Sequence, residues 1–239
     1  MTSPPGDPAP SLPGARAIRA VPPAQALAWY TEALRLFKRA PVRFGLLAIA
    51  IAALQLVLSL IPLVGPPAAN VIVPIVASSL LFAALAVDRG DKPRALHLFA
   101  PFAAPVQAIA AVIAAALCVS GAEWLAGWHF AGANILSIED ITGLAASDYV
   151  LVYVTGVAVS LPLTLVPLLA FFEGAGVRDA FDWSVRAFAR NVGAFAVYGA
   201  LSVVLLGVVF VTQGIATPIV LPLWAVSSYA AWKDLFGAA

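Results

Sequence analysis

The stretch "FGLLAIAIAALQLVLSLIPL", residues 44–63, decides the fold class of this chain. It contains no charged residue and is about as long as an α-helix must be to cross a hydrocarbon core roughly 30 Å thick. Similar runs recur along the sequence and predict six membrane spans, at about 44–63, 69–87, 103–126, 149–172, 192–211 and 215–232. The sequence therefore predicts an all-α polytopic membrane helix bundle whose spans form three hairpins.

The composition differs from that of a soluble protein. Of the 239 residues, 62% are hydrophobic and 10% are charged, whereas a soluble domain devotes about a quarter of its residues to charge. The single cysteine, Cys118, lies in an apolar run, which excludes a disulfide framework and a Cys/His zinc site. Residues 1–23 hold seven prolines and predict a disordered Pro-rich tail, with partner binding as the alternative, and 24–239 form the six-span domain.

The Lys and Arg residues predict the orientation of the spans. All 13 fall in four segments, which lie before the first predicted span and after the second, fourth and sixth. With six spans these segments share one side of the membrane, and the positive-inside rule makes that side cytoplasmic. We therefore predict a multi-pass protein of the bacterial inner (plasma) membrane, with both termini in the cytoplasm and one sizeable outer loop at about 127–148.

Two segments, about 24–39 and 177–190, predict amphipathic helices on the cytoplasmic side, directly before the first and fifth spans. Helical spacing gives each an apolar stripe, formed by Leu27, Tyr30, Leu34 and Phe37 or by Phe181, Val185, Phe188 and Val192. Such helices suit the interface with an anionic leaflet, and packing on the bundle's own inner mouth is a compatible alternative. The candidate contacts to lipid or to a partner are Trp29, Arg35, Lys38, Arg39, Trp183, Arg186 and Arg190.

The three hairpins share sequence features. A shorter segment, "KPRALHLFAPF" (92–102), precedes the third span, so that one short cytoplasmic helix introduces each hairpin. The second spans all contain an aliphatic–proline–aliphatic step, in "VPIV" from 73, "LPLTLVPLL" from 161 and "LPLW" from 221. An offset of 148 residues aligns Pro74 with Pro222 and Ser79 with Ser227. These features predict an internal repeat of three copies in parallel orientation.

The prolines within the spans are the strongest sequence indication of a cavity. A membrane proline frees a backbone carbonyl, and a helix broken in this way can line a substrate site, although kinks without a site are the alternative. Gln55 and Gln107 lie more centrally than the acidic residues of the spans, and hydrogen bonds to neighbouring helices suit them. The candidate cavity residues are Pro74, Pro162, Pro167, Pro222, Gln55 and Gln107.

The sequence contains few residues in catalytic arrangements. It has no metalloprotease, serine-hydrolase or phosphate-binding motif, and His97 and His129 are predicted on opposite sides of the membrane. We expect no enzyme, no metal or other cofactor, and no nucleic-acid partner. The expected function is contact with anionic lipids of the cytoplasmic leaflet, with another protein or with a second copy of the chain. The alternative is a small transporter or exporter of an apolar or lipid-like substrate.

The order of these motifs resembles a known group of proteins. An amphipathic "W…LF+" helix is followed by a hairpin that closes in "SLIPLVG" and opens into a proline-bearing span. This pattern is similar to that of uncharacterised proteobacterial six-span inner-membrane proteins, akin to the YciC-like proteins and to the membrane domain beside some glycerophosphodiester phosphodiesterases. The resemblance covers residues 21–100 and, more weakly, 177–235. It implies the location and the fold, but no established activity and no functional residues.

Overall fold

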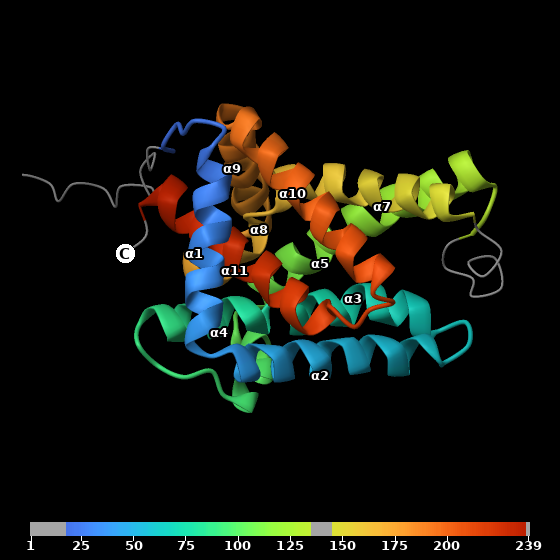
Figure 1. The fold of residues 1–239 in the computed structure, drawn as a ribbon, viewed down its shortest axis with the longest axis horizontal. Coiled ribbons are helices and arrows are strands. Elements are labelled where there is room, and N and C mark those ends of the chain that lie inside the picture. The colour runs from blue at the N-terminus through green and yellow to red at the C-terminus, as the bar shows by residue number, and fades with distance from the viewer. Residues whose placement is uncertain (1–17, 135–144, 238–239) are drawn as a thin grey trace, which may run out of the picture.

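The computed structural model describes residues 18–134 and 145–237, and the described chain is helical without strands (Figure 1). The parts of the predicted tail and outer loop at 1–17 and 135–144 lie outside the described residues. The helices, in chain order, are α1 (Gln25–Arg39), α2 (Pro41–Ser59), α3 (Gly65–Ala77), α4 (Ser79–Asp88), η1 (Ala95–Ala103), α5 (Val106–Ala126), η2 (Gly127–Ala131), α7 (Ala146–Ser160), η3 (Leu161–Leu163), α8 (Val166–Phe172), α9 (Val177–Arg190), α10 (Val192–Val211) and α11 (Thr217–Phe236).

Five described segments are long and apolar enough to cross a membrane, namely Pro41–Ser59, Gly65–Asp88, Val106–Ala131, Ser147–Phe172 and Val192–Val211. The chain is therefore a multi-pass helical membrane protein. Helix α11 occupies the position of the sixth predicted span but is less apolar than these five, because it contains Ser227, Ser228, Lys233 and Asp234. Eleven of its 20 residues are buried within the bundle. A helix surrounded by protein can retain polar residues that a lipid-facing helix could not.

Two of the spans are broken where prolines interrupt the backbone hydrogen bonds. In the second span, α3 ends three residues after Pro74, and the Ser78 hydroxyl donates to the Pro74 carbonyl at 2.9 Å. In the fourth span, α7, η3 and α8 follow one another, with Pro162 in η3 and Pro167 in the first turn of α8. Prolines lack the N–H that continues a helix, so the freed groups need other partners.

Ser184 of α9 supplies these partners in the fourth span. Its buried hydroxyl donates to the Pro162 carbonyl at 2.7 Å and accepts from the Leu165 N–H at 3.2 Å. A side chain of a helix outside the spans thus completes the hydrogen bonding of a broken span. Helix α9 is therefore part of the bundle as well as a candidate for membrane contact.

Helices α1 and α9 lie across one end of the bundle and meet the following span at a sharp corner (Figure 1). The backbone leaves the helical conformation at Ala40 (φ −149°, ψ 52°) and, similarly, at Asn191 (φ −128°, ψ 33°). The buried Asn191 amide accepts from the Val21 N–H at 2.8 Å and donates to the carbonyls of Arg19 and Ala187. This amide ties the α9–α10 corner to the segment that precedes α1.

The elements pack in a cyclic order. The short helix that leads each predicted hairpin packs on the second span of the preceding hairpin. Helix η1 packs on α4, α9 packs on α8, and α1 packs on α11. The first spans follow the same rule, since α5, α10 and α2 contact α3, α7 and α11. The contacts of α1 and α2 with α11 close the ring. Three repeated hairpins would pack in this order, while the sequence repeat itself stays a prediction.

Candidate functional site

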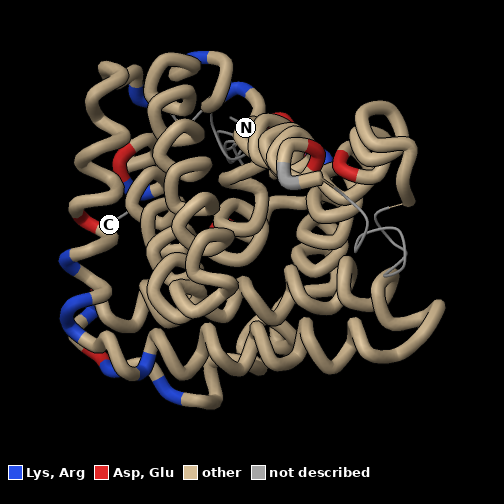
Figure 2. Tube along the Cα trace, turned by 45° about the vertical axis from the view of Figure 1, so that its right-hand side comes forward, with Lys and Arg blue, Asp and Glu red and all other residues tan. Residues whose placement is uncertain are grey.

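The basic end of the bundle is the end at which α1, η1, α9 and the last turns of α11 lie. The Lys and Arg residues of the described chain lie in the segment before α1, in α1, in the first turn of α2, in the connection after α4, in α9 and in the last turns of α11, and Figure 2 shows them gathered toward one side. The opposite end holds the α2–α3, α5–α7 and α10–α11 connections, none of whose described residues is Lys or Arg. The basic end is therefore the surface to consider for contact with anions.

Helix α1 has three faces at this end. The face against the bundle is formed by Ala26, Trp29, Ala33 and Leu36, all at most 2% exposed. Beside it runs an apolar edge, where Leu27 is 53% and Leu34 is 41% exposed. The third face is charged and holds Glu32, Arg35, Lys38 and Arg39. The predicted stripe of Leu27, Tyr30, Leu34 and Phe37 thus lies along the edge of the contact with the bundle rather than at its centre.

Helix α9 repeats this arrangement. Ala180, Ser184 and Ala187 are buried against the bundle, and Val177 and Val185 are 37% and 44% exposed beside them. Its charged face holds Asp179, Asp182, Arg186 and Arg190. Small residues alone form the buried face of α9, which allows close approach to the spans, whereas the buried face of α1 also holds Trp29 and Leu36. The more exposed Leu and Val side chains lie on the edge between the bundle and the charged face.

Several of the predicted contact residues already have partners within the protein. Arg35 forms an ion pair with Glu32, whose hydrogen bonds raise the pKa of the guanidinium above its ordinary value. Arg39 donates to the Val87 carbonyl at 3.4 Å. Arg186 pairs with Asp182 at 2.9 Å, and its guanidinium lies 5.8 Å from the centre of the half-buried Trp183 ring.

The remaining predicted contact residues differ in their availability. Trp29 is 2% exposed, which removes it from any lipid contact. Within residues 18–134 and 145–237, no ion pair or hydrogen bond engages the exposed side chains of Lys38 or Arg190. Lys38 and Arg190 are therefore the two predicted contacts whose charges are available to a ligand.

A set of carboxylates that the sequence reasoning missed holds this end together. Asp88, Glu173 and Asp234 lie at or next to the basic end of the three second spans. A carboxylate near a helix C-terminus is electrostatically unfavourable unless donors surround it. The signal was present in the sequence as one acid near the same end of each second span.

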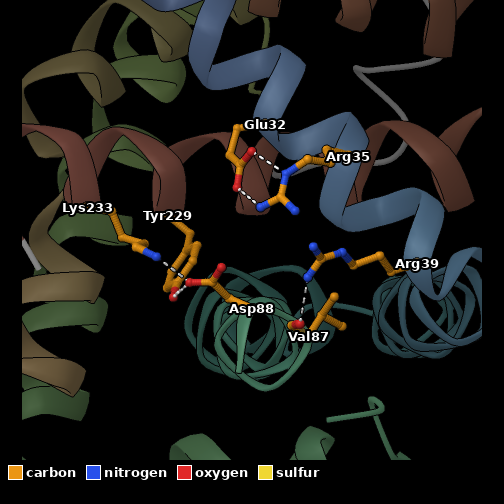
Figure 3. A network of polar contacts seen from close by, with 7 residues as sticks. All are labelled: Glu32, Arg35, Arg39, Val87, Asp88, Tyr229 and Lys233. Atoms are coloured by element: carbon orange, nitrogen blue, oxygen red, sulfur yellow. Dashed lines mark hydrogen bonds and ion pairs between the residues drawn. The ribbon is translucent and has the colours of Figure 1, made fainter. Parts of the chain in front are cut away.

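The last turns of α11 take part in the contacts of all three carboxylates. Residues of α11 donate to Asp88 and Glu173, and Asp234 belongs to α11 itself. Lys233 and the Tyr229 hydroxyl (2.9 Å) donate to Asp88, and Trp232 Nε1 donates to Glu173 at 2.8 Å. Asp234 accepts from Arg19, Gln25 Nε2 and Trp29 Nε1, the last two at 2.8 and 2.9 Å. Figure 3 shows Lys233 and Tyr229 converging on Asp88, close to the Glu32–Arg35 pair and the Arg39–Val87 contact. These contacts join α1, α4 and α11.

The structure places two of the candidate cavity prolines on one pocket. Pro74 and Pro167 line a pocket of about 310 Å³ halfway along the second, third and fourth spans, together with Val112, Ala115, Ala116, Val119, Leu163 and the hydroxyl residues Ser78, Ser120, Ser160 and Thr164. Three of these hydroxyls donate to carbonyls of their own helix, at 2.8 to 2.9 Å. The pocket is therefore mainly apolar in chemistry despite its polar residues.

The other candidate cavity residues lie elsewhere. The Pro162 carbonyl faces Ser184, and Pro222 is buried within α11. Gln55 is exposed and bonds to Ser59 on its own helix at 3.3 Å. Gln107 is exposed at the start of α5, next to Gly176. The structure thus brings together Pro74 and Pro167 but not the two glutamines.

The residues 18–134 and 145–237 contain no group of three or more His, Cys, Asp or Glu side chains placed to hold a metal ion. Comparisons with protein-family models, with curated proteins and with solved structures find no match for this chain. The resemblance to the YciC-like proteins therefore stays a prediction. The function must be inferred from the geometry of the basic end and of the pocket.

Proposed function

We propose that this membrane protein is a non-enzymatic component of a bacterial inner membrane that works through contacts of α1 and α9 with the anionic cytoplasmic leaflet. The positive-inside rule supports placing the basic end, and with it both termini, in the cytoplasm. On this placement α1 and α9 lie at the depth of the headgroups. A second protein or a second copy of the chain would use the same surface.

The observation that carries this proposal is the shared arrangement of the two helices. In each, an exposed apolar edge (Leu27 and Leu34, or Val177 and Val185) separates the face against the bundle from a charged face. A helix that only covered the bundle would not need that edge, whereas a helix in the interface rests it on the acyl chains. Lys38 and Arg190 are then free to attract anionic headgroups.

The depth of the two helices in the membrane tests this proposal. In a Cys118→Ser background, a fluorophore on a single cysteine at Leu34 or Val185 should be quenched by nitroxides on lipid acyl chains. The matched control positions, Arg35 and Arg186, are the next residues in the chain and lie exposed on the charged faces of the same helices. We expect quenching at least about twofold stronger on the apolar edge, because only that edge reaches the acyl boundary.

Anionic lipid provides the second part of the same measurement. The labelled protein is measured in nanodiscs. Adding phosphatidylglycerol to the nanodisc lipid should strengthen the quenching at Leu34 and Val185, and the double change Lys38→Glu and Arg190→Glu should remove that gain. Equal quenching at all four positions, or a gain that survives the charge reversal, would contradict the proposal. A partner protein that covers the edge would instead protect all four positions from both lipid and aqueous quenchers.

A second candidate function, carriage of an apolar or lipid-like substrate, is favoured by the pocket that Pro74 and Pro167 line. Its position halfway along three spans is where transporters bind their substrates. Ala116 lines this pocket, so Ala116→Phe should fill it and abolish movement of a fluorescent lysophospholipid across proteoliposomes. Cys118→Phe adds a ring at an exposed position of the same helix and should leave the movement unchanged. The same rate in wild type and Ala116→Phe would exclude this role for the pocket.

A further inference from the structure

A second pocket, of about 610 Å³, lies at the basic end between the end of α4 and η1. Its lining residues are Ala86, Asp91, Lys92, Arg94, Leu96, His97, Phe99, Ala100 and Ala103. None of them takes part in the contacts of α1 and α9 proposed above. The lining is divided between basic and apolar side chains, which complement the anionic headgroup and the apolar acyl chains of a phospholipid.

The polar part of the pocket favours an anion. Lys92 and Arg94 are exposed and carry two positive charges, against one negative charge on Asp91. Arg43 adds a third positive charge beside them, because its guanidinium donates to the Pro93 carbonyl at 2.8 Å. The His97 ring is held against the Arg94 backbone, with Nδ1 2.9 Å from the Arg94 nitrogen and 3.0 Å from its carbonyl oxygen.

The connection that carries these residues is held in place before any ligand binds. Gly90, at φ 88°, ends α4 in a left-handed turn in which the Asp91 N–H donates to the Ala86 carbonyl at 2.8 Å and the Gly90 N–H to Val87 at 3.1 Å. Arg39 and Arg43 reach the two ends of this connection, at the carbonyls of Val87 and Pro93. A fixed loop loses little conformational freedom on binding, which favours a defined site over a diffuse basic surface.

The apolar part of the pocket favours a lipid over a free anion. Leu96 and Phe99 line it and are 74% and 65% exposed, and Phe102 on the same short helix is 48% exposed. Inorganic phosphate would satisfy Lys92 and Arg94 and leave these side chains uncovered. An acyl chain would cover them and remove their surface from water.

We propose that this pocket binds one molecule of an anionic phospholipid, with its phosphodiester between Lys92 and Arg94 and an acyl chain along Leu96 and Phe99. The proposal rests on the orientation used in the proposed function, which places η1 at the cytoplasmic headgroups. It adds a defined, stoichiometric site to the general attraction that α1 and α9 exert. The lipid class follows from the charge, because a zwitterionic headgroup brings its own cation near Lys92 and Arg94.

Native mass spectrometry of the full chain, delipidated and then titrated with phosphatidylglycerol, tests the site. We expect one tightly retained phosphatidylglycerol molecule for each chain and clearly weaker retention of phosphatidylcholine with the same acyl chains. The double variant Lys92→Gln and Arg94→Gln should weaken phosphatidylglycerol binding about tenfold or more, since each basic residue near an anionic headgroup contributes about fivefold. Both side chains are exposed, so the variant should melt at the wild-type temperature.

A matched variant, Lys38→Gln and Arg190→Gln, removes the same charge from α1 and α9 and separates this site from the proposed function. Retention unaffected by that variant but lost with Lys92 and Arg94 supports the pocket. Equal losses in both variants would overturn the pocket and leave the general attraction standing. Equal retention of the two lipids, or binding of inorganic phosphate in place of phosphatidylglycerol, would also overturn it. Leu96→Ser with Phe99→Ser should weaken phosphatidylglycerol binding and leave the charges in place.

Discussion

Asp234→Ala should destabilise the bundle by about 2–3 kcal/mol, because it leaves the Trp29 indole N–H buried without an acceptor. Trp29 is 2% exposed and is held among the rings of Phe195 and Tyr198, at 5.7 and 6.2 Å, so it cannot turn its N–H to water. Gln25 loses its acceptor in the same change, whereas Arg19, with 63% of its side chain exposed, is rehydrated at little cost. An SDS unfolding titration in mixed micelles measures the loss.

Asp182→Ala is the matched control for this change. It also removes a carboxylate from an ion pair, but both Asp182 and Arg186 are exposed, and such surface pairs contribute about 0–1 kcal/mol. Asp234→Asn keeps one acceptor oxygen for Trp29 and should fall between the two. If Asp234→Ala costs no more than Asp182→Ala, the contact between α1 and α11 does not stabilise the fold in the way described.

Gly65→Ala should cost about 3 kcal/mol, at the upper end of the range for overpacked sites. Gly65 begins α3, and a Cβ at this position would lie 1.8 Å from the Leu58 carbonyl oxygen and 3.1 Å from Ile61 Cβ. The clash is with backbone rather than with a mobile side chain, so the turn that joins α2 to α3 must open. The Gly65 N–H to Ile61 bond, at 3.0 Å, lies in the same turn and would be strained as well.

Gly121→Ala makes the same chemical change where, apart from the adjacent residues and the backbone of its own helix, no atom lies within 4 Å of the added methyl group. Alanine is the better helix former by about 1 kcal/mol, so this variant should be as stable as wild type or slightly more stable. The two melting temperatures in detergent, compared with wild type, check the prediction. A Gly65→Ala protein that melts with the wild type would mean that the α2–α3 turn is wider than described.

The spans could be predicted from sequence because their signal is simple. An uninterrupted apolar run such as 44–63 is long enough to cross a membrane and too long for most other roles, and five such runs are helices in the structure. The sequence also predicts the two polar helices before spans, at 24–39 and 177–190, and the structure has helices at Gln25–Arg39 and Val177–Arg190. The local sequence pattern is therefore sufficient to predict an element when the composition of that element alone decides whether it lies in the membrane or outside it.

The face of each polar helix that lies against the bundle could not be predicted in the same way. Hydropathy favoured the stripe through Leu27 and Leu34, but the bundle buries Ala26, Trp29 and Ala33 instead. Lipid and protein interior are both apolar, so hydropathy does not separate a face that meets one from a face that meets the other. The decisive partner of Trp29 is Asp234, 205 residues away in the chain, and no local pattern points to it.

The closed ring has a consequence for the order in which the protein forms. Helix α1 leaves the ribosome early, yet the surface that buries Trp29 is provided largely by α11, which is synthesised last among the described helices. Until then the face of Ala26, Trp29 and Ala33 is uncovered and available to chaperones, to proteases or to another chain. Packing of α1 on α11 therefore requires that all intervening spans have been inserted. A chain stalled before α11 would expose this face, and its exposure would distinguish an incompletely assembled chain from a complete one.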